Sequence, residues 1–146
     1  MKGIVHIGHV AIKVTDLKKS LDYYEKRLGF PEMLRLHNDD GTPWLGYMRI
    51  TDEQYLEIFP GAENDRAPGR NANGVNHMCF TIEDLDGTVA RIEEAGIMLL
   101  SPIKEGLDGN RQAWLEDPDG NRIELMEMKP GCLQFEAIER LHREGR

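Results

Sequence analysis

The chain contains an internal repeat, and this feature constrains its fold more than any other. "HVAIKVTDLKKSLDYYEKRLGF" begins at His9, and "HMCFTIEDLDGTVARIEEAGI" begins at His77. Each copy runs from a histidine through a strand-like pattern to an Asp-Leu pair and then an amphipathic stretch. Gly29 and Gly96 close the two stretches, as glycines at helix C-termini do. The sequence therefore predicts the same strand-helix unit twice.

Each copy continues into a similar second part. "DEQYLEIFP" ends the first half and "DGNRIELMEM" ends the second, with the turn signals Asp40-Gly41 and Asp119-Gly120 between short strands. Each half is predicted to be a strand, a helix and three strands. "CLQFEAIERLHREGR" indicates a further amphipathic helix. We therefore expect an α+β fold in one domain, residues 1–146. Its parts are a first βαβββ module (4–60), a connector (61–73), a second module (74–128) and a helical tail (129–146).

The composition excludes several function classes. The 146-residue chain carries a net charge of -8, whereas binding to nucleic-acid phosphates needs a basic surface. No stretch approaches the roughly 20 apolar residues of a membrane helix, and the N-terminus is too polar for a signal-peptide core. The two cysteines make no disulfide framework. We expect a soluble, cytoplasmic protein with no nucleic-acid or membrane partner.

Four polar residues occupy matching positions in the repeat. Glu57 follows His9 by 48 residues, and Glu124 follows His77 by 47. Side chains alternate across a strand, so each of these residues lies opposite the apolar positions of its own strand. The apolar faces can pack on the helices, which leaves His, Glu, His and Glu on the other face. Pairing of the two halves could bring the four together.

Two imidazoles and two carboxylates in a partly apolar cup suit a divalent first-row metal. Without a metal, two carboxylates buried together would repel each other. The alternative is that each residue is separately solvated or hydrogen-bonded, and coincidence of both parity and repeat position argues against it. Cys79 shares the face of His77 and is expected to be a small wall residue. Asp117 and Asp119 are expected to shape their turn.

With these residues in place, the chain resembles the vicinal oxygen chelate superfamily, and within it the glyoxalase I-like members of the glyoxalase-bleomycin resistance protein-dioxygenase family. The resemblance covers residues 4–128 and depends most on "EDPDGNRIELMEM". It implies paired βαβββ modules whose mixed sheet curls around one divalent metal, nickel, zinc, cobalt or manganese. The implied ligands are His9, Glu57, His77 and Glu124. Whether they come from one chain or from two is left open.

The implied activity is that of a lactoylglutathione lyase-like lyase or isomerase. Such an enzyme removes a proton next to a carbonyl and stabilises the resulting enediolate with its metal. The resemblance makes Glu124 the catalytic base and Glu57 its symmetric counterpart. The expected substrate is a small α-oxo or α-hydroxy compound or a thiol adduct. Two alternatives stay open: an epimerase or isomerase of another acid or sugar derivative, and a non-catalytic protein that binds a small molecule such as an antibiotic.

Residues expected to contact the substrate lie on the same faces as the four polar residues. Bacterial glyoxalase I enzymes place an arginine where this chain has Lys13 and an asparagine where it has Gly61. Lysine keeps the positive charge of arginine but not its bidentate geometry toward a carboxylate. The identity of the thiol in a thiol-adduct substrate therefore stays open. The candidate substrate-binding residues are Lys13, Tyr55, Phe59 and Met126.

The C-terminal tail carries an apolar stripe that the repeat does not cover. Leu133, Ala137, Ile138 and Leu141 recur at helical spacing. An exposed stripe of this kind often marks an interface. We therefore expect a homodimer, with the tail contributing to its contact or capping the cup. The alternative is a helix that folds back on its own chain.

Overall fold

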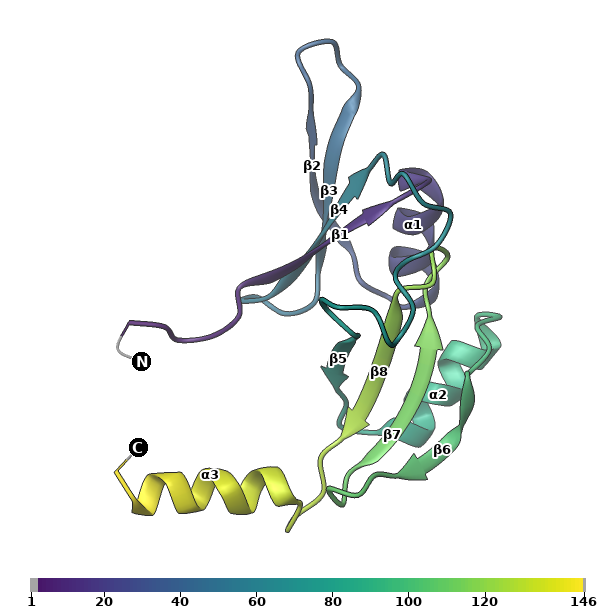
Figure 1. Cartoon of the computed structure of the whole chain (residues 1–146). Coiled ribbons are helices and arrows are strands. Elements are labelled where there is room, and N and C mark those ends of the chain that lie inside the picture. The colour runs from purple at the N-terminus through teal and green to yellow at the C-terminus, as the bar shows by residue number, and fades with distance from the viewer. Residues whose placement is uncertain (1–2, 146) are drawn as a thin grey trace. The chain divides into compact units, whose positions relative to one another are not determined.

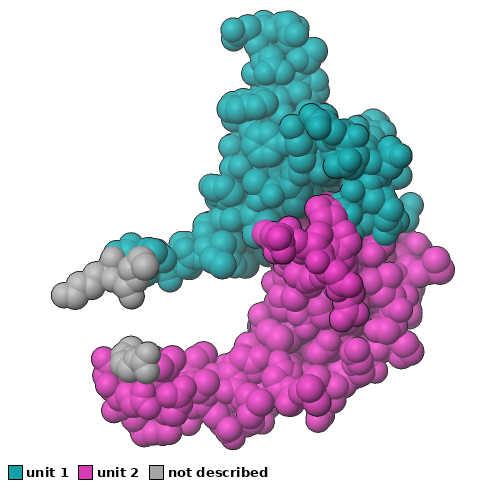
Figure 2. Space-filling view, viewed as in Figure 1, with its two compact units in different colours: residues 1–67, 117–120 teal, residues 68–116, 121–146 magenta. Residues whose placement is uncertain are grey.

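A computed structural model describes residues 3–145, which form two compact units (Figure 2). Unit 1 comprises the chain up to Ala67 together with Asp117–Gly120. Unit 2 comprises Pro68–Glu116 and the chain from Asn121 onward. Over the described range, no helix is long and apolar enough to cross a membrane.

Unit 1 contains one four-stranded mixed sheet in the order β1-β4-β3-β2 (Figure 1). β1 pairs with β4 in parallel, and the other two pairs are antiparallel. Its elements are β1 (His9–Val14), α1 (Leu17–Asp22), the π-helical segment η1 (Tyr23–Arg27), β2 (Glu32–His37), β3 (Pro43–Arg49) and β4 (Tyr55–Pro60).

Unit 2 repeats this topology, with strand order β5-β8-β7-β6 and a parallel β5–β8 pair. The predicted succession of strand, helix and three strands is therefore confirmed in both halves. One boundary differs, because the strand that was expected to contain His77 begins one residue later. The elements are β5 (Met78–Thr81), α2 (Leu85–Glu94), β6 (Ser101–Glu105), β7 (Arg111–Glu116), β8 (Arg122–Glu127) and α3 (Leu133–Arg143).

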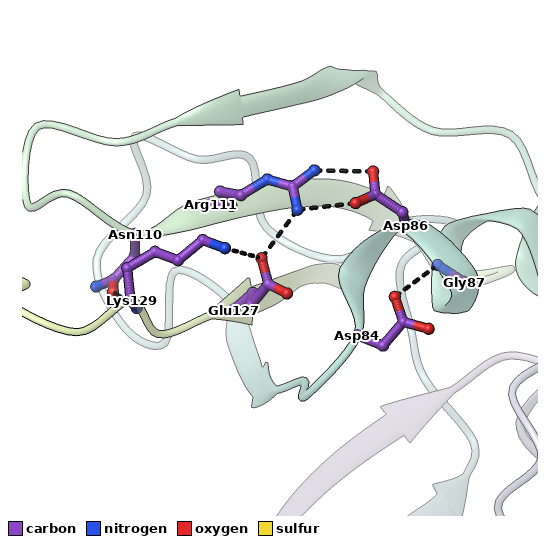
Figure 3. Close-up of polar contacts among 7 residues, drawn as sticks. All are labelled: Asp84, Asp86, Gly87, Asn110, Arg111, Glu127 and Lys129. Atoms are coloured by element: carbon purple, nitrogen blue, oxygen red, sulfur yellow. Dashed lines mark hydrogen bonds and ion pairs between the residues drawn. The ribbon is translucent and has the colours of Figure 1, made fainter.

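The repeated Asp-Leu pairs start the two helices. The Asp16 carboxylate accepts a hydrogen bond of 3.0 Å from the Lys19 amide, and Asp84 accepts one of 3.0 Å from Gly87 (Figure 3). These contacts satisfy amide groups that have no partner within the helix. Both helical segments are followed by a glycine at a φ of 78°, Gly29 and Gly96. The predicted helix starts and stops are therefore confirmed.

The apolar faces of the strands form the core, as strand parity predicts. Leu56, Ile58 and Ile123 are fully buried, and Leu125 is nearly so. α1 packs on β3 and β4 of its sheet, and α2 packs on β7 and β8. In unit 1 the approach is close, because a Cβ on Gly46 would lie 2.7 Å from Leu21 Cδ2.

The first helical segment is not a regular α-helix over its whole length. It widens into η1, where the adjacent residues Tyr23 and Tyr24 are both buried. A π-helical turn carries more residues than an α-turn and so changes which side chains face the sheet. This local change cannot be read from apolar spacing alone.

The turn between β7 and β8 belongs to unit 1 through its two buried aspartates. The expected turn-shaping bond is present, from the Asp119 amide to Asp117 at 3.0 Å. In addition, Asp119 accepts bonds from the amide and hydroxyl of Thr15, at 2.8 and 2.7 Å, and Asp117 accepts one from Tyr24 at 2.9 Å. The two carboxylates thus also tie the turn to the first module.

The expected C-terminal helix is present as α3. Its first turn is attached to the loop before β7, where Gln134 donates to Asp108 at 2.6 Å and accepts from Asn110 at 2.9 Å. No residue of α3 is buried, and Leu133 and Ile138 of the predicted stripe are 57 % and 45 % exposed.

Candidate active site

Unit 1 brings His9 and Glu57 together on the sheet face that does not carry the helix. In the parallel β1–β4 pair, His9 lies opposite Tyr55 and Ala11 lies opposite Glu57. His9 and Glu57 are therefore diagonal neighbours on one face, and His9 Nε2 lies 3.7 Å from Glu57 Oε2. The Glu57 side chain is only 14 % exposed, whereas the His9 side chain is 45 % exposed.

Unit 2 repeats this arrangement with His77 and Glu124. Cys79 lies opposite Glu124 in the β5–β8 pair, the position that Ala11 occupies in unit 1. His77 Nε2 lies 3.1 Å from Glu124 Oε2, and the two side chains are 32 % and 12 % exposed. Each histidine thus lies beside the glutamate of its own half.

Two aromatic residues that the sequence analysis did not select flank these pairs. Tyr47 lies opposite Glu57 in the β3–β4 pair, and Trp114 lies opposite Glu124 in the equivalent β7–β8 pair. Loss of water contact and the adjacent Glu57 carboxylate raise the pKa of the Tyr47 hydroxyl. Both residues occupy corresponding places in the third strand of each half, and this was the signal available in the sequence.

Neighbouring groups hold both imidazole rings in place. The His9 ring stacks on Tyr55, with centroids 5.3 Å apart, and the His77 ring meets Trp114 edge-on at 4.8 Å. The Asn76 side-chain oxygen lies 3.0 Å from His77 Nδ1. A proton on Nδ1 would be donated to this oxygen, which leaves Nε2 free to bind a metal.

Cys79 has the character of a wall residue rather than a nucleophile. Although Cys79 is exposed, partial loss of water contact, followed by the nearby Glu124 carboxylate, raises the pKa of its thiol to about 12. The thiol therefore stays protonated at neutral pH, and the thiolate is the reactive form.

The candidate substrate residues are divided between the units. Lys13 and Phe59 lie opposite each other in unit 1, where Phe59 also meets Trp44 at a centroid distance of 6.4 Å. Tyr55 contacts His9 as described. Met126 lies in unit 2, opposite Thr81 and Gln112. Their role in substrate binding stays a prediction.

The two His–Glu pairs have the donor chemistry of metal ligands, and the pair in unit 2 also has their spacing. Two ligand atoms at about 2.1 Å from one ion and about 90° apart are separated by about 3.0 Å, close to the 3.1 Å in unit 2. Within residues 3–145, however, no three His, Cys, Asp or Glu side chains gather into a group that could hold a metal. Each unit by itself therefore brings together two candidate ligands.

Comparison with known proteins identifies the class to which this architecture belongs. Residues 6–125, which are most of the chain, match the Glyoxalase/Bleomycin resistance protein/Dioxygenase superfamily. The protein is a member of this superfamily.

Similar proteins include both named enzymes and uncharacterised ones. The chain is 30 % identical over 129 residues to a lactoylglutathione lyase from Neisseria meningitidis, covering 84 % of this chain and 91 % of that enzyme. It is 27 % identical over 128 residues to the uncharacterised protein YaeR of Escherichia coli, covering 87 % and 99 %. Among solved structures, a glyoxalase family protein from Enterococcus faecalis aligns with a TM-score of 0.73 and 27 % identity, covering 84 % and 97 %.

Proposed function

We propose that the protein is a divalent-metal-dependent lyase or isomerase of the glyoxalase I type, with His9, Glu57, His77 and Glu124 as metal ligands. The observation that carries the proposal is the repeated His–Glu pair, found at corresponding positions of both units with its glutamate largely buried. The similarity to named lactoylglutathione lyases supports the same reaction class.

The residues divide the chemistry between binding and proton transfer. A bound divalent metal would polarise the substrate carbonyl and stabilise the negative charge that forms on its oxygen. Glu124 is proposed to take the proton from the carbon next to the carbonyl and to return it to the carbonyl carbon. Its burial and its contact with His77 hold the carboxylate on the open face of the sheet. Glu57 is the symmetric counterpart in unit 1.

A homodimer is part of the proposal. Each unit supplies only two ligands, so four ligands require a unit 1 and a unit 2 to meet, from one chain or from two. The exposed apolar side chains of α3 favour association, since an uncovered stripe of this kind commonly marks an interface. The metal site is thus proposed to be completed in the assembled protein.

The test is turnover by the purified protein loaded separately with nickel, cobalt, manganese or zinc. Methylglyoxal is supplied with glutathione, bacillithiol or coenzyme A, and formation of the hydroxyacyl thioester is followed. We expect metal at stoichiometry and turnover with at least one thiol. A chain that retains none of the four metals, or that binds metal and turns over none of the adducts, would contradict the proposed activity.

A further inference from the structure

A pocket of about 480 Å³ opens on unit 2 beside the His77–Glu124 pair. We call it the Trp114 pocket. Trp114 is shared between the two features, because its ring contacts His77 and also lines the pocket. The volume falls within the range of small-molecule sites. The charged, aromatic and amide side chains of its lining include Arg70, Asn76, Lys104, Gln112, Trp114 and Arg122.

The lining is cationic in an acidic protein. The chain has 26 acidic and 18 basic residues, yet three of the basic ones, Arg70, Lys104 and Arg122, line this pocket and no described acidic residue does. In the part of the chain that the structure describes, none of the three forms an ion pair with a carboxylate. Three cations that converge without a counter-charge form a site suited to an anion.

Arg111, in the same sheet, differs from these three cations because its charge is paired with carboxylates. Its guanidinium bonds to Asp86 through both terminal nitrogens at 2.8 Å and to Glu127 at 3.0 Å (Figure 3). Lys129 lies 3.1 Å from the same Glu127 carboxylate. These cations are neutralised by protein groups and serve the fold. In the described part of the chain, Arg70, Lys104 and Arg122 of the Trp114 pocket have no such carboxylate partner.

Arg122 is also held in a fixed orientation. Its guanidinium lies 4.6 Å from the centroid of Trp114 and donates a hydrogen bond of 3.4 Å to Asn76. The indole nitrogen of Trp114 donates in turn to Gln112 at 2.6 Å, which restrains the ring. A planar guanidinium held on an aromatic face retains free N–H groups for a carboxylate or a phosphate.

We propose that the Trp114 pocket binds an anionic group of the substrate, a carboxylate or a phosphate, and so holds the substrate beside the His77–Glu124 pair. The inference rests on the proposed function in taking this pair as part of the reaction site. It assigns Arg70, Lys104 and Arg122 as the specificity-determining residues of unit 2.

Binding is tested without metal or turnover. Trp44→Phe leaves Trp114 as the single tryptophan of the chain. Its fluorescence is titrated with inorganic phosphate and with succinate at constant ionic strength, with chloride as the balancing anion. We expect a saturable response to at least one anion, and the preferred one distinguishes phosphate from carboxylate. Lys104→Gln and Arg122→Gln should weaken this binding at least tenfold. Arg91→Gln, an exposed cation on α2, is the control and should change it less than twofold.

Two outcomes would overturn the proposal. One is the absence of a saturable response to either anion. The other is unchanged anion affinity in the Lys104→Gln variant, in which the stacking of Arg122 on the reporter ring is left in place. Loss of fold in the Arg122→Gln variant would therefore not hide the answer.

A second measurement connects the pocket to turnover. Hemithioacetals of methylglyoxal with 3-mercaptopropionate and with 2-mercaptoethanol differ in carrying or lacking a carboxylate. In Lys104→Gln, the kcat/KM for the 3-mercaptopropionate adduct, divided by that for the 2-mercaptoethanol adduct, should fall at least tenfold. An unchanged ratio counts against the proposal. If the protein binds the anions through these residues but turns over neither adduct, only the proposed reaction is contradicted.

Discussion

The hydroxyl of Tyr24 donates a hydrogen bond of 2.9 Å to Asp117, which lies 93 positions further along the chain. Tyr24 is fully buried and Asp117 is 5 % exposed. Burial and the adjacent carboxylate raise the pKa of Tyr24, so the tyrosine stays a hydrogen-bond donor at every ordinary pH. This contact connects the first helical segment with the turn between β7 and β8.

Tyr24→Phe should therefore lower the free energy of unfolding. The variant keeps the ring but removes the donor, and the loss of one hydrogen bond to a buried carboxylate costs about 1–3 kcal/mol. Urea unfolding measures the change. Lys26→Gln, which removes an exposed ion pair with Asp22, is the control and should have little effect. Equal stability of Tyr24→Phe and wild type would show that the bond contributes nothing.

Metal binding should depend on both repeat-related pairs. His77→Ala should bind nickel or zinc more weakly than wild type, because it removes one of the four proposed ligands. Co-expression of His9→Ala chains with His77→Ala chains separates the two possible arrangements. If the site forms between chains, mixed dimers recover one intact site; if it forms within a chain, none is recovered. Wild-type metal affinity in His77→Ala would contradict the ligand assignment.

Glu124→Gln should lose turnover while keeping its fold. Glu124 lies on the open face of β8, and its neighbours Ile123 and Leu125 supply the core contacts. Loss of the base should lower kcat by about 10² to 10⁴. Glu83→Gln, outside both pairs, is the matched control. A folded, metal-loaded Glu124→Gln variant with near-normal activity would rule out the proposed role.

Stability should fall in acid partly through the cluster around Arg111. Lys129 and then Arg111 hold the pKa of Glu127 below its usual range, and the bonds from Arg111 do the same for Asp86. Because these folded-state pKa values lie below the unfolded ones, the stabilisation is present above about pH 4–5 and is lost as the pH falls further.

Arg111→Gln is the variant that tests this dependence. Urea unfolding between about pH 3 and 6 should show a shallower loss of stability than in wild type, since Asp86 loses its main cationic partner and Glu127 loses one of two. Arg91→Gln should retain the wild-type slope. An equally steep slope in Arg111→Gln would show that the cluster does not control the acid response.

The full-length protein should be a dimer at tens of micromolar, and removal of α3 should weaken it. Truncation after Lys129 removes the helix, and Ile138→Glu places a charge on its exposed apolar face while retaining the Gln134 contacts. Light scattering should show both variants shifted toward monomer. A truncated protein that remains fully dimeric would exclude α3 from the interface, and a monomeric full-length chain would end the dimer prediction.

The order of elements and the strand face that carries each of the four polar residues could be predicted from the sequence. Strand parity placed Glu57 opposite the core residues Leu56 and Ile58, and the repeat related His9 to His77. Asp16 and Asp84 indicated where the helices begin, because an N-cap hydrogen bond joins residues only three positions apart. Alternation and capping operate within a few positions of the chain, and the repeat is visible because the same local pattern occurs twice.

Other features depended on which strands and loops become neighbours. Tyr47 and Trp114 flank the glutamates because of the register in which β3 pairs with β4 and β7 pairs with β8. The bonds from Tyr24 and Thr15 to the β7–β8 turn span more than 90 positions. Arg70, Lys104 and Arg122 come from a connector, an edge strand and an inner strand. Only tertiary packing brings such distant groups together. Their contacts depend on which strands and loops become neighbours, and the local spacing of residues does not determine this.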